Sequence, residues 1–204
     1  MDNSAGRPER QWQVLLLGGP SGVGKTVVSY QLALRFGVGI TEVDDFQALL
    51  ERMTTPEQQP AIHFWRTHPM PDQLRTAEII QHLLEQSETM SIGLEAVIAN
   101  HLKASTPVVL EGDFILPALA AHESFLGQMN LGRVRGAILY EPDEQQFVAN
   151  YLSREPESGP QVKRAHVSWR HGLWLKQEAE RYGLPVVLAR PWHTVLERLI
   201  AAVA

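Results

Sequence analysis

The chain has 204 residues, of which 44% are hydrophobic, and this length and composition are typical of one globular domain. Its formal charge of -5 argues against a nucleic-acid coat or a membrane-surface binder, because both need a basic field. There are no cysteines, which excludes disulfides and thiolate metal sites. No apolar run approaches the roughly 18 residues of a membrane span, and the polar start contains no apolar signal segment. We therefore expect a cytoplasmic single domain over residues 1–204, with a loose tail at residues 1–10.

Apolar, β-prone runs alternate with helical patterns along the chain. The runs predict strands at residues 14–17, 38–43, 107–110, 134–140 and 185–188. Between them, the spacing of apolar residues predicts helices at residues 27–36, 73–86, 89–104, 143–152, 162–182 and 192–203, and one more that begins near Phe46. This alternation indicates an α/β fold in which a parallel sheet of five strands has helices on both faces.

The stretch after the first predicted strand carries the most specific pattern in the chain. Residues 19–26 read GPSGVGKT and match the phosphate-binding pattern G-x-x-x-x-G-K-[ST]. Glycines let backbone N–H groups wrap an anion, and the start of the next helix adds partial positive charge. Lys25 suits the outer phosphates, and the Thr26 hydroxyl suits Mg²⁺. The pattern predicts that a nucleoside triphosphate binds to Gly19, Pro20, Ser21, Gly22, Val23, Gly24, Lys25 and Thr26.

Carboxylates follow the second and third predicted strands. Asp44 and Asp45 end the second strand, where strand ends of open α/β sheets face the ligand crevice. We expect at least one of them to be catalytic, and the alternative is that one is the N-cap of the next helix. Glu111 follows the third strand directly and suits Mg²⁺ or a polarised nucleophile. Asp113 shares this expectation, with a turn or cap before residues 115–129 as its alternative.

The segment at residues 54–72 breaks the helical pattern, since its four prolines exclude a long helix. Between the prolines lie one tryptophan, one arginine and two histidines: His63, Trp65, Arg66 and His68. An arginine beside histidines suits an anionic group, and a tryptophan suits the apolar face of a sugar or ring. We expect a substrate-side insertion that binds a small acceptor, anionic or ring-bearing, chiefly through Arg66. A structured surface loop, in which Phe64 and Trp65 pack down, is the alternative.

A polar segment at residues 153–165 separates two predicted helices. It carries Arg154, Lys163 and Arg164, and Arg170 follows about two turns further on. Because guanidinium groups stabilise charge on a transferring phosphoryl group, this segment is interpreted as a lid over the triphosphate. The alternative is a solvated linker.

These motifs together resemble the P-loop small-molecule kinases, which have the nucleoside-monophosphate-kinase-like fold. The GGPSGVGKT turn, the D-D strand end and the E-G strand end are most similar to the 2-phosphoglycerate kinase-like group, and chloramphenicol phosphotransferase is a more distant relative. The resemblance implies strand order 2-3-1-4-5, ATP and Mg²⁺ as cofactors, and an aspartate after the second strand that acts on the acceptor hydroxyl. By motif match, that role falls on Asp44 or Asp45. The insertion matches no acceptor site of the group, so the substrate does not carry over.

The predicted function is an ATP-dependent kinase for a hydroxyl of a small metabolite, acting on neither nucleic acid nor membrane. The candidate catalytic residues are Lys25, Asp44, Asp45, Glu111, Asp113, Arg154 and Arg164, and the candidate metal ligands are Thr26 and Glu111. The eight histidines show no metal-ligand spacing. A nucleotide-dependent regulatory protein without a small acceptor, and an enzyme that phosphorylates a macromolecule, are the alternatives. Oligomeric state is open.

Overall fold

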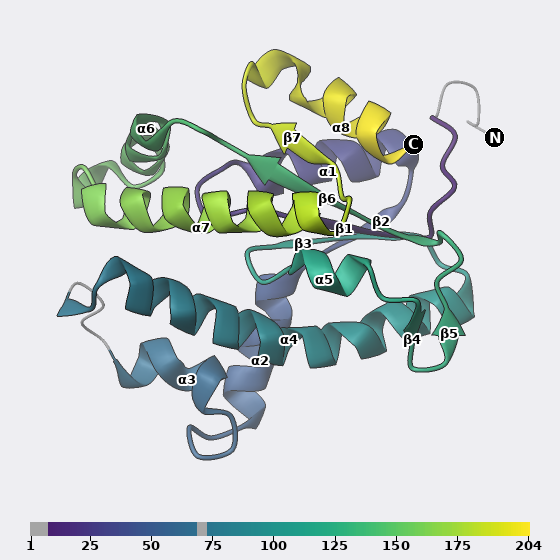
Figure 1. Ribbon diagram of the computed structural model, residues 1–204, viewed down its shortest axis with the longest axis horizontal. Coiled ribbons are helices and arrows are strands. Elements are labelled where there is room, and N and C mark those ends of the chain that lie inside the picture. The colour runs from purple at the N-terminus through teal and green to yellow at the C-terminus, as the bar shows by residue number, and fades with distance from the viewer. Residues whose placement is uncertain (1–7, 69–72) are drawn as a thin grey trace.

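A five-stranded parallel sheet lies at the centre of the computed structural model, which describes residues 8–68 and 73–204 (Figure 1). Its strands, in the order β2-β3-β1-β6-β7, are β2 (Gly39–Glu42), β3 (Val108–Gly112), β1 (Val14–Gly18), β6 (Val134–Tyr140) and β7 (Val186–Leu188). Two short strands, β4 (Ser124–Phe125) and β5 (Gln128–Met129), form a separate antiparallel hairpin. Counted within the sheet, the order is 2-3-1-4-5, so the predicted fold class is confirmed.

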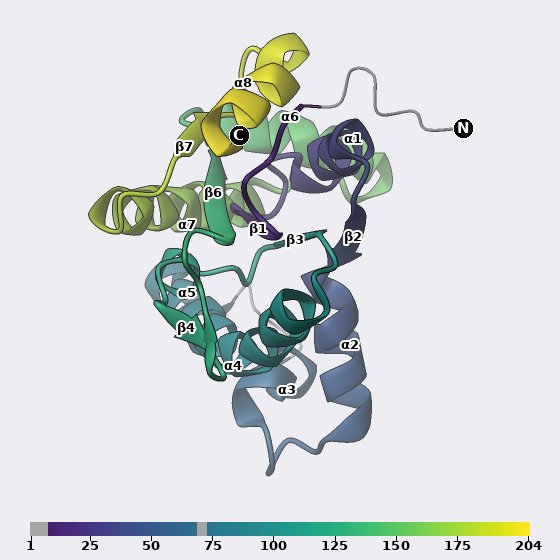
Figure 2. The same cartoon turned by 90° about the vertical axis from the view of Figure 1, so that its right-hand side faces the viewer.

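Helices cover both faces of the sheet (Figure 2). One face packs on α1 (Lys25–Phe36) and α8 (Val195–Val203), and the other packs on α4 (Thr76–Ala104), α5 (Pro117–Ala120) and α7 (Val162–Arg181). In β1, Leu15 and Leu17 belong to the first core, whereas Val14 and Leu16 belong to the second. All four are fully buried because successive strand side chains point to opposite faces.

The remaining elements lie near the carboxyl ends of the strands, on the left in Figure 1. They are α2 (Val43–Met53), α3 (Pro60–Thr67), α6 (Glu144–Arg154) and the 3-10 turn η2 (Pro156–Ser158). A second 3-10 turn, η3 (Trp192–Thr194), precedes α8, so the predicted last helix is divided into two parts. Among the described residues, no helix has the length and apolarity needed to cross a membrane. The predicted insertion contains α3, with Pro60 in its first turn, and its residues 69–72 lie outside the described ranges, as do residues 1–7 of the predicted tail.

Helix α2 begins at Val43, three residues earlier than predicted. Val43 is fully buried against Gly112, where an added Cβ would come within 2.7 Å of the Val43 Cβ. This close approach sets the start of the helix. Glu42 is therefore the N-cap residue, and the alternative in which Asp44 or Asp45 caps the helix is wrong. Both aspartates lie in the first turn, where negative charge interacts favourably with the helix dipole.

Helix α4 is continuous over 29 residues, so the predicted break between residues 86 and 89 is wrong. The polar residues at the expected break are accommodated inside the helix, since their hydroxyls bond to carbonyls one turn earlier. Ser87 Oγ donates to Leu83 O at 2.7 Å, and Thr89 Oγ1 donates to Glu85 O at 2.9 Å. Residues 115–129 form α5 and the hairpin, and the N-cap of α5 is Leu116, so Asp113 caps no helix there.

The phase of the continuous helix gives a stability prediction. Leu94 is 1% exposed and faces the sheet, whereas Ile92 on the same helix is 74% exposed. Leu94→Ala should lower the free energy of unfolding by about 2–5 kcal/mol, and Ile92→Ala by less than about 0.5 kcal/mol. Urea denaturation of both variants measures this difference. Equal losses would contradict the helix phase described here.

Candidate functional site

The phosphate-binding pattern forms a loop between β1 and α1. Gly22 and Gly24 have φ angles of 79° and 99°, which glycine adopts without strain. An added Cβ at Gly22 would lie 2.9 Å from Tyr151 Cζ, and one at Gly24 would lie 2.5 Å from Trp192 Cη2. Gly24 is also the N-cap of α1 and offers no side-chain cap, which leaves the first N–H groups of the helix to an anion.

The residues that follow the loop contact the carboxylates at the end of β3. Lys25 is 6% exposed, and its Nζ donates to Pro20 O at 3.1 Å and forms an ion pair with Asp113. Thr26 Oγ1 donates to Glu111 Oε1 at 2.8 Å. The structure therefore brings together four of the predicted site residues, which come from two distant parts of the sequence.

Helix α2 supplies one further carboxylate to this cluster. Asp44 lines the same cavity as the loop, Lys25 and Asp113, whereas Asp45 is not among the described residues that line it. Although Asp44 stays open to solvent, the surrounding protein removes enough water to raise its pKa, and the nearby Asp113 carboxylate acts in the same direction. The Lys25 charge opposes both effects. Geometry thus favours Asp44 over Asp45 as the acid that faces the site.

Glu111 is the most deeply buried carboxylate of the cluster, at 3% exposed. Burial raises its pKa, while the Lys25 charge and the Thr26 hydrogen bond favour the ionised form. A cation beside Glu111 would favour ionisation further. Mg²⁺ prefers oxygen ligands and keeps several of its waters, so Thr26 and Glu111 fit such an ion without a larger set of protein ligands. Across residues 8–68 and 73–204, no group of three or more histidine, aspartate or glutamate side chains could hold a metal.

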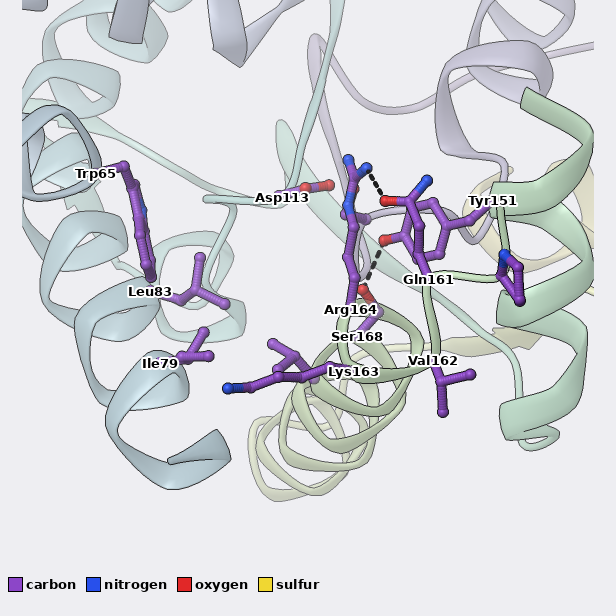
Figure 3. Close-up of a pocket in the computed structure, with 13 residues that line it drawn as sticks. Trp65, Ile79, Leu83, Asp113, Tyr151, Gln161, Val162, Lys163, Arg164 and Ser168 are labelled. Atoms are coloured by element: carbon purple, nitrogen blue, oxygen red, sulfur yellow. Dashed lines mark hydrogen bonds between the residues drawn. The ribbon is translucent and has the colours of Figure 1, made fainter. Parts of the chain in front are cut away.

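Two cavities meet at this cluster. The first, of about 540 Å³, is lined by the loop, Thr26, Asp44, Asn150 and Arg154. The second, of about 850 Å³, lies between α3 and α4 on one side and α7 on the other (Figure 3). Ser21, Asp113 and Tyr151 line both cavities, so the two cavities adjoin at the end of the loop.

Two of the predicted lid arginines lie beside the cavities. The guanidinium carbons of Arg154 and Arg164 lie 5.1 and 4.3 Å from the centre of the Tyr151 ring. Both arginines also pair with Glu155, at 2.7 and 2.9 Å. Hydrogen bonds from Gln161 and Arg154 lower the pKa of Glu155 to about 2. Arg170 does not join them, since it lines a groove between α4 and α7.

The insertion contributes only one of its four predicted residues to these cavities. Trp65 lines the 850 Å³ cavity. His63 is buried, with its Nε2 3.0 Å from Thr54 Oγ1, and His68 stacks on Phe64. Arg66 lines a separate cavity of about 330 Å³. Arg66 therefore does not line either cavity at the loop, because the phase of α3 turns it away from the side that carries Trp65, and its contact with an acceptor stays a prediction.

Sequence reasoning missed several residues of the site. Asn150 Nδ2 donates to Gly22 O at 2.8 Å, and Tyr151 OH lies 2.7 Å from Ser168 Oγ. His171 is 2% exposed, and its Nε2 has no hydrogen-bond partner among the described residues. Burial lowers the pKa of His171 to about 4, and the Lys25 charge contributes. No local pattern marks these residues, because each acquires its role from a partner far away in the sequence.

The buried histidine gives a pH prediction. The pKa of His171 lies near 4 in the folded chain and near 6.5 when unfolded. The unfolded chain therefore binds one more proton in this window, and stability falls as the pH decreases from about 6.5 to 4. His171→Gln should flatten that part of the curve of melting temperature against pH, while the exposed His193→Gln should keep the wild-type slope. If the curves of both variants ran parallel to the wild-type curve, this result would contradict the burial of a neutral His171.

No family model matches the chain, but curated proteins named 2-phosphoglycerate kinase are similar to it. The protein from Pyrococcus horikoshii is 27% identical over 114 residues, which cover 54% of this chain and 38% of that protein. The protein from Methanothermobacter thermautotrophicus is 24% identical over 186 residues, which cover 85% of this chain and 60% of that protein. The chain thus spans less than two thirds of the length of these curated relatives.

Solved structures agree in fold at low sequence identity. A gluconokinase from Sinorhizobium meliloti has a TM-score of 0.53 and 16% identity, covering 96% of this chain and 93% of its own. A putative kinase from Chloroflexus aurantiacus has a TM-score of 0.54 and 14% identity, covering 94% and 93%. The chain shares the fold of the P-loop small-molecule kinases, and it is similar in sequence to 2-phosphoglycerate kinases.

Proposed function

We propose that this protein is an ATP-dependent kinase that transfers the γ-phosphoryl group to a hydroxyl of a small metabolite. The observation that carries the proposal is the meeting of two cavities at the end of the phosphate-binding loop. One cavity contains the loop and Lys25, and the other is large enough for an organic acceptor. Such an arrangement suits transfer between two ligands held end to end, since phosphoryl transfer depends chiefly on positioning and charge neutralisation.

In this proposal, the loop from Gly19 to Gly24 holds the phosphates of ATP through its N–H groups and the start of α1. The Lys25 ammonium would exchange its ion pair with Asp113 for the outer phosphates of ATP. Thr26 and Glu111 hold Mg²⁺, directly or through its waters. The ion supplies charge neutralisation on the phosphates when it is bound.

Asp44 has the proposed role of receiving or orienting the acceptor hydroxyl. It faces the loop cavity, and its raised pKa brings it closer to the range of a useful general base. Asp113 lies where the cavities join and would orient Lys25 and the acceptor. Asp45, the other candidate from the sequence, stays outside this proposal because it does not line the described cavity.

The segment at residues 153–165 is proposed as a lid. Its Arg154 lines the first cavity and its Arg164 lines the second, so both lie within reach of a transferring phosphoryl group. Glu155 pairs with both guanidinium groups. A bound triphosphate would compete with Glu155 for these arginines and close the segment over the nucleotide.

The kinase relatives and the shared fold support this function over its alternatives. A regulatory nucleotide-binding protein would need no second cavity at the end of the loop. The first test is a screen of hydroxylated metabolites for stimulated ADP release in the presence of Mg²⁺. ADP release that no hydroxylated compound stimulates would favour the regulatory alternative.

The first functional prediction concerns Lys25. Lys25→Ala should remove most ATP affinity or turnover, since the ammonium neutralises the outer phosphates inside a largely buried site. Isothermal titration with ATP and a steady-state assay measure the two quantities. The exposed Lys103→Ala is the matched control, and a thermal melt verifies that each variant folds. Wild-type ATP binding and turnover in Lys25→Ala would eliminate the loop as the nucleotide site.

The second prediction separates the two aspartates. Asp44→Asn should lower kcat by roughly 10²- to 10⁴-fold with little change in ATP affinity, whereas Asp45→Asn should keep most of the rate. In the wild type, activity should fall as the pH decreases through a pKa above the ordinary aspartate value of 3.8, because protonated Asp44 no longer accepts a proton. The pH profile of kcat is the measurement. The opposite ranking of the two variants would assign the role to Asp45.

A further inference from the structure

Within the proposed kinase function, on which this inference rests, the large cavity has one apolar wall and an opposite wall that mixes polar and apolar side chains (Figure 3). Trp65 from α3 and Ile79 and Leu83 from α4 form the apolar wall. Arg164 and Ser168 from α7, with Tyr151 from α6, lie opposite, and Asp113 marks the end nearest the loop. An acceptor that reaches Asp113 within this cavity can therefore also lie along the indole.

The Trp65 ring is fixed before any ligand binds. Its Nε1 donates to Gln86 Oε1 at 3.0 Å, and Gln86 is fully buried in α4. Phe64 contacts the indole edge-on, with ring centres 4.8 Å apart and an angle of 87°. Phe64 is itself stacked against His82 at 3.5 Å. Because the indole is held by contacts from two helices, a ligand that lies on its face need not order it.

Both cations among the described residues that line this cavity, Lys163 and Arg164, come from α7 and not from the helices that form the wall with Trp65. Lys163 Nζ donates to Leu74 O at 2.7 Å, and Arg164 pairs with Glu155 and also donates to Gln161 Oε1 at 2.9 Å. A three-carbon acceptor with two anionic groups, such as 2-phosphoglycerate, would need cationic partners along its length. The long wall offers apolar carbon and an indole face instead. A volume of about 850 Å³ is also within the range of cavities that enclose ligands of drug size.

We infer that the acceptor is a ring-bearing alcohol whose ring lies against the Trp65 indole while one hydroxyl points toward Asp44 and Asp113. Trp65 is then the residue that determines acceptor class. Its role is to position the acceptor, and the transferred group does not touch it. The flat face of an indole favours the C–H face of a sugar or cyclitol, or an aromatic ring, over an open three-carbon chain.

The test compares two acceptor sets at saturating ATP and Mg²⁺, with ADP release as the readout. The ring-bearing set contains shikimate, myo-inositol and D-ribose, and the open-chain set contains 2-phosphoglycerate, glycerate and glycerol. At least one ring-bearing compound should stimulate ADP release more than every open-chain compound. For that compound, Trp65→Ala should raise the acceptor KM about tenfold or more, with the ATP KM unchanged.

Two further variants separate the contact from a general loss of structure. Trp65→Phe keeps a flat face and should give an acceptor KM between those of the wild type and Trp65→Ala. Arg66→Ala changes the neighbouring residue of α3, which lines a different cavity, and should leave both KM values at wild-type levels. If Trp65→Ala fails to fold, as a thermal melt would report, the deciding measurement is whether Trp65→Phe raises the acceptor KM above the wild-type value while the ATP KM is unchanged.

The outcomes distinguish this inference from the function on which it rests. Turnover of 2-phosphoglycerate above all ring-bearing compounds, with a KM that Trp65→Phe does not alter, overturns the inference and leaves the kinase proposal in place. Retained ATP binding with no stimulation by any member of either set counts against the kinase proposal itself and therefore also against the inference. A ring-bearing acceptor whose KM depends on residue 65 supports both.

Discussion

The parallel pairing of β1 with β3 is the constraint on which the site depends. In this register Leu17 lies opposite Glu111 and Gly18 lies opposite Gly112. The turn after β1 and the acids at the end of β3 therefore reach the same edge of the sheet, where Thr26 bonds to Glu111. A shift of one residue would send every side chain of β3 to the opposite face and remove these contacts.

At that edge of the sheet, the positive charge of Lys25 balances only part of the negative charge of the nearby carboxylates. Asp44, Glu111 and Asp113 gather around Lys25, and the pKa values of Asp44 and Glu111 are raised. Burial is the first cause in both cases, and the neighbouring carboxylates add to it. This excess of negative charge suits a divalent cation, which in turn compensates for the arriving phosphates. In the proposed complex, Mg²⁺ and ATP would therefore offset each other's charge beside this cluster.

The 850 Å³ cavity, which is the proposed acceptor site, depends on contacts between helices. The indole of Trp65 belongs to α3, the Gln86 amide that holds it belongs to α4, and the opposite wall comes from α7. Continuity of α4 through Ser87 keeps Gln86 and Leu83 in phase, so one helix both fixes the indole and extends the apolar wall. The curated relatives share sequence with this chain over part of their length. The acceptor 2-phosphoglycerate belongs to the names of those proteins.

The sequence by itself predicted the phosphate-binding loop and the five strands, because each depends on contiguous residues or on apolar runs typical of a buried parallel sheet. The strand order, which the structure confirms, followed from the resemblance to the P-loop small-molecule kinases. The sequence also identified Glu111 and Asp113 as acids near that loop. Only the tertiary structure distinguished Asp44 from Asp45 and Trp65 from Arg66. The physical reason is that neighbouring residues of a helix point about 100° apart, so the choice between them depends on helix phase, which packing against distant residues sets.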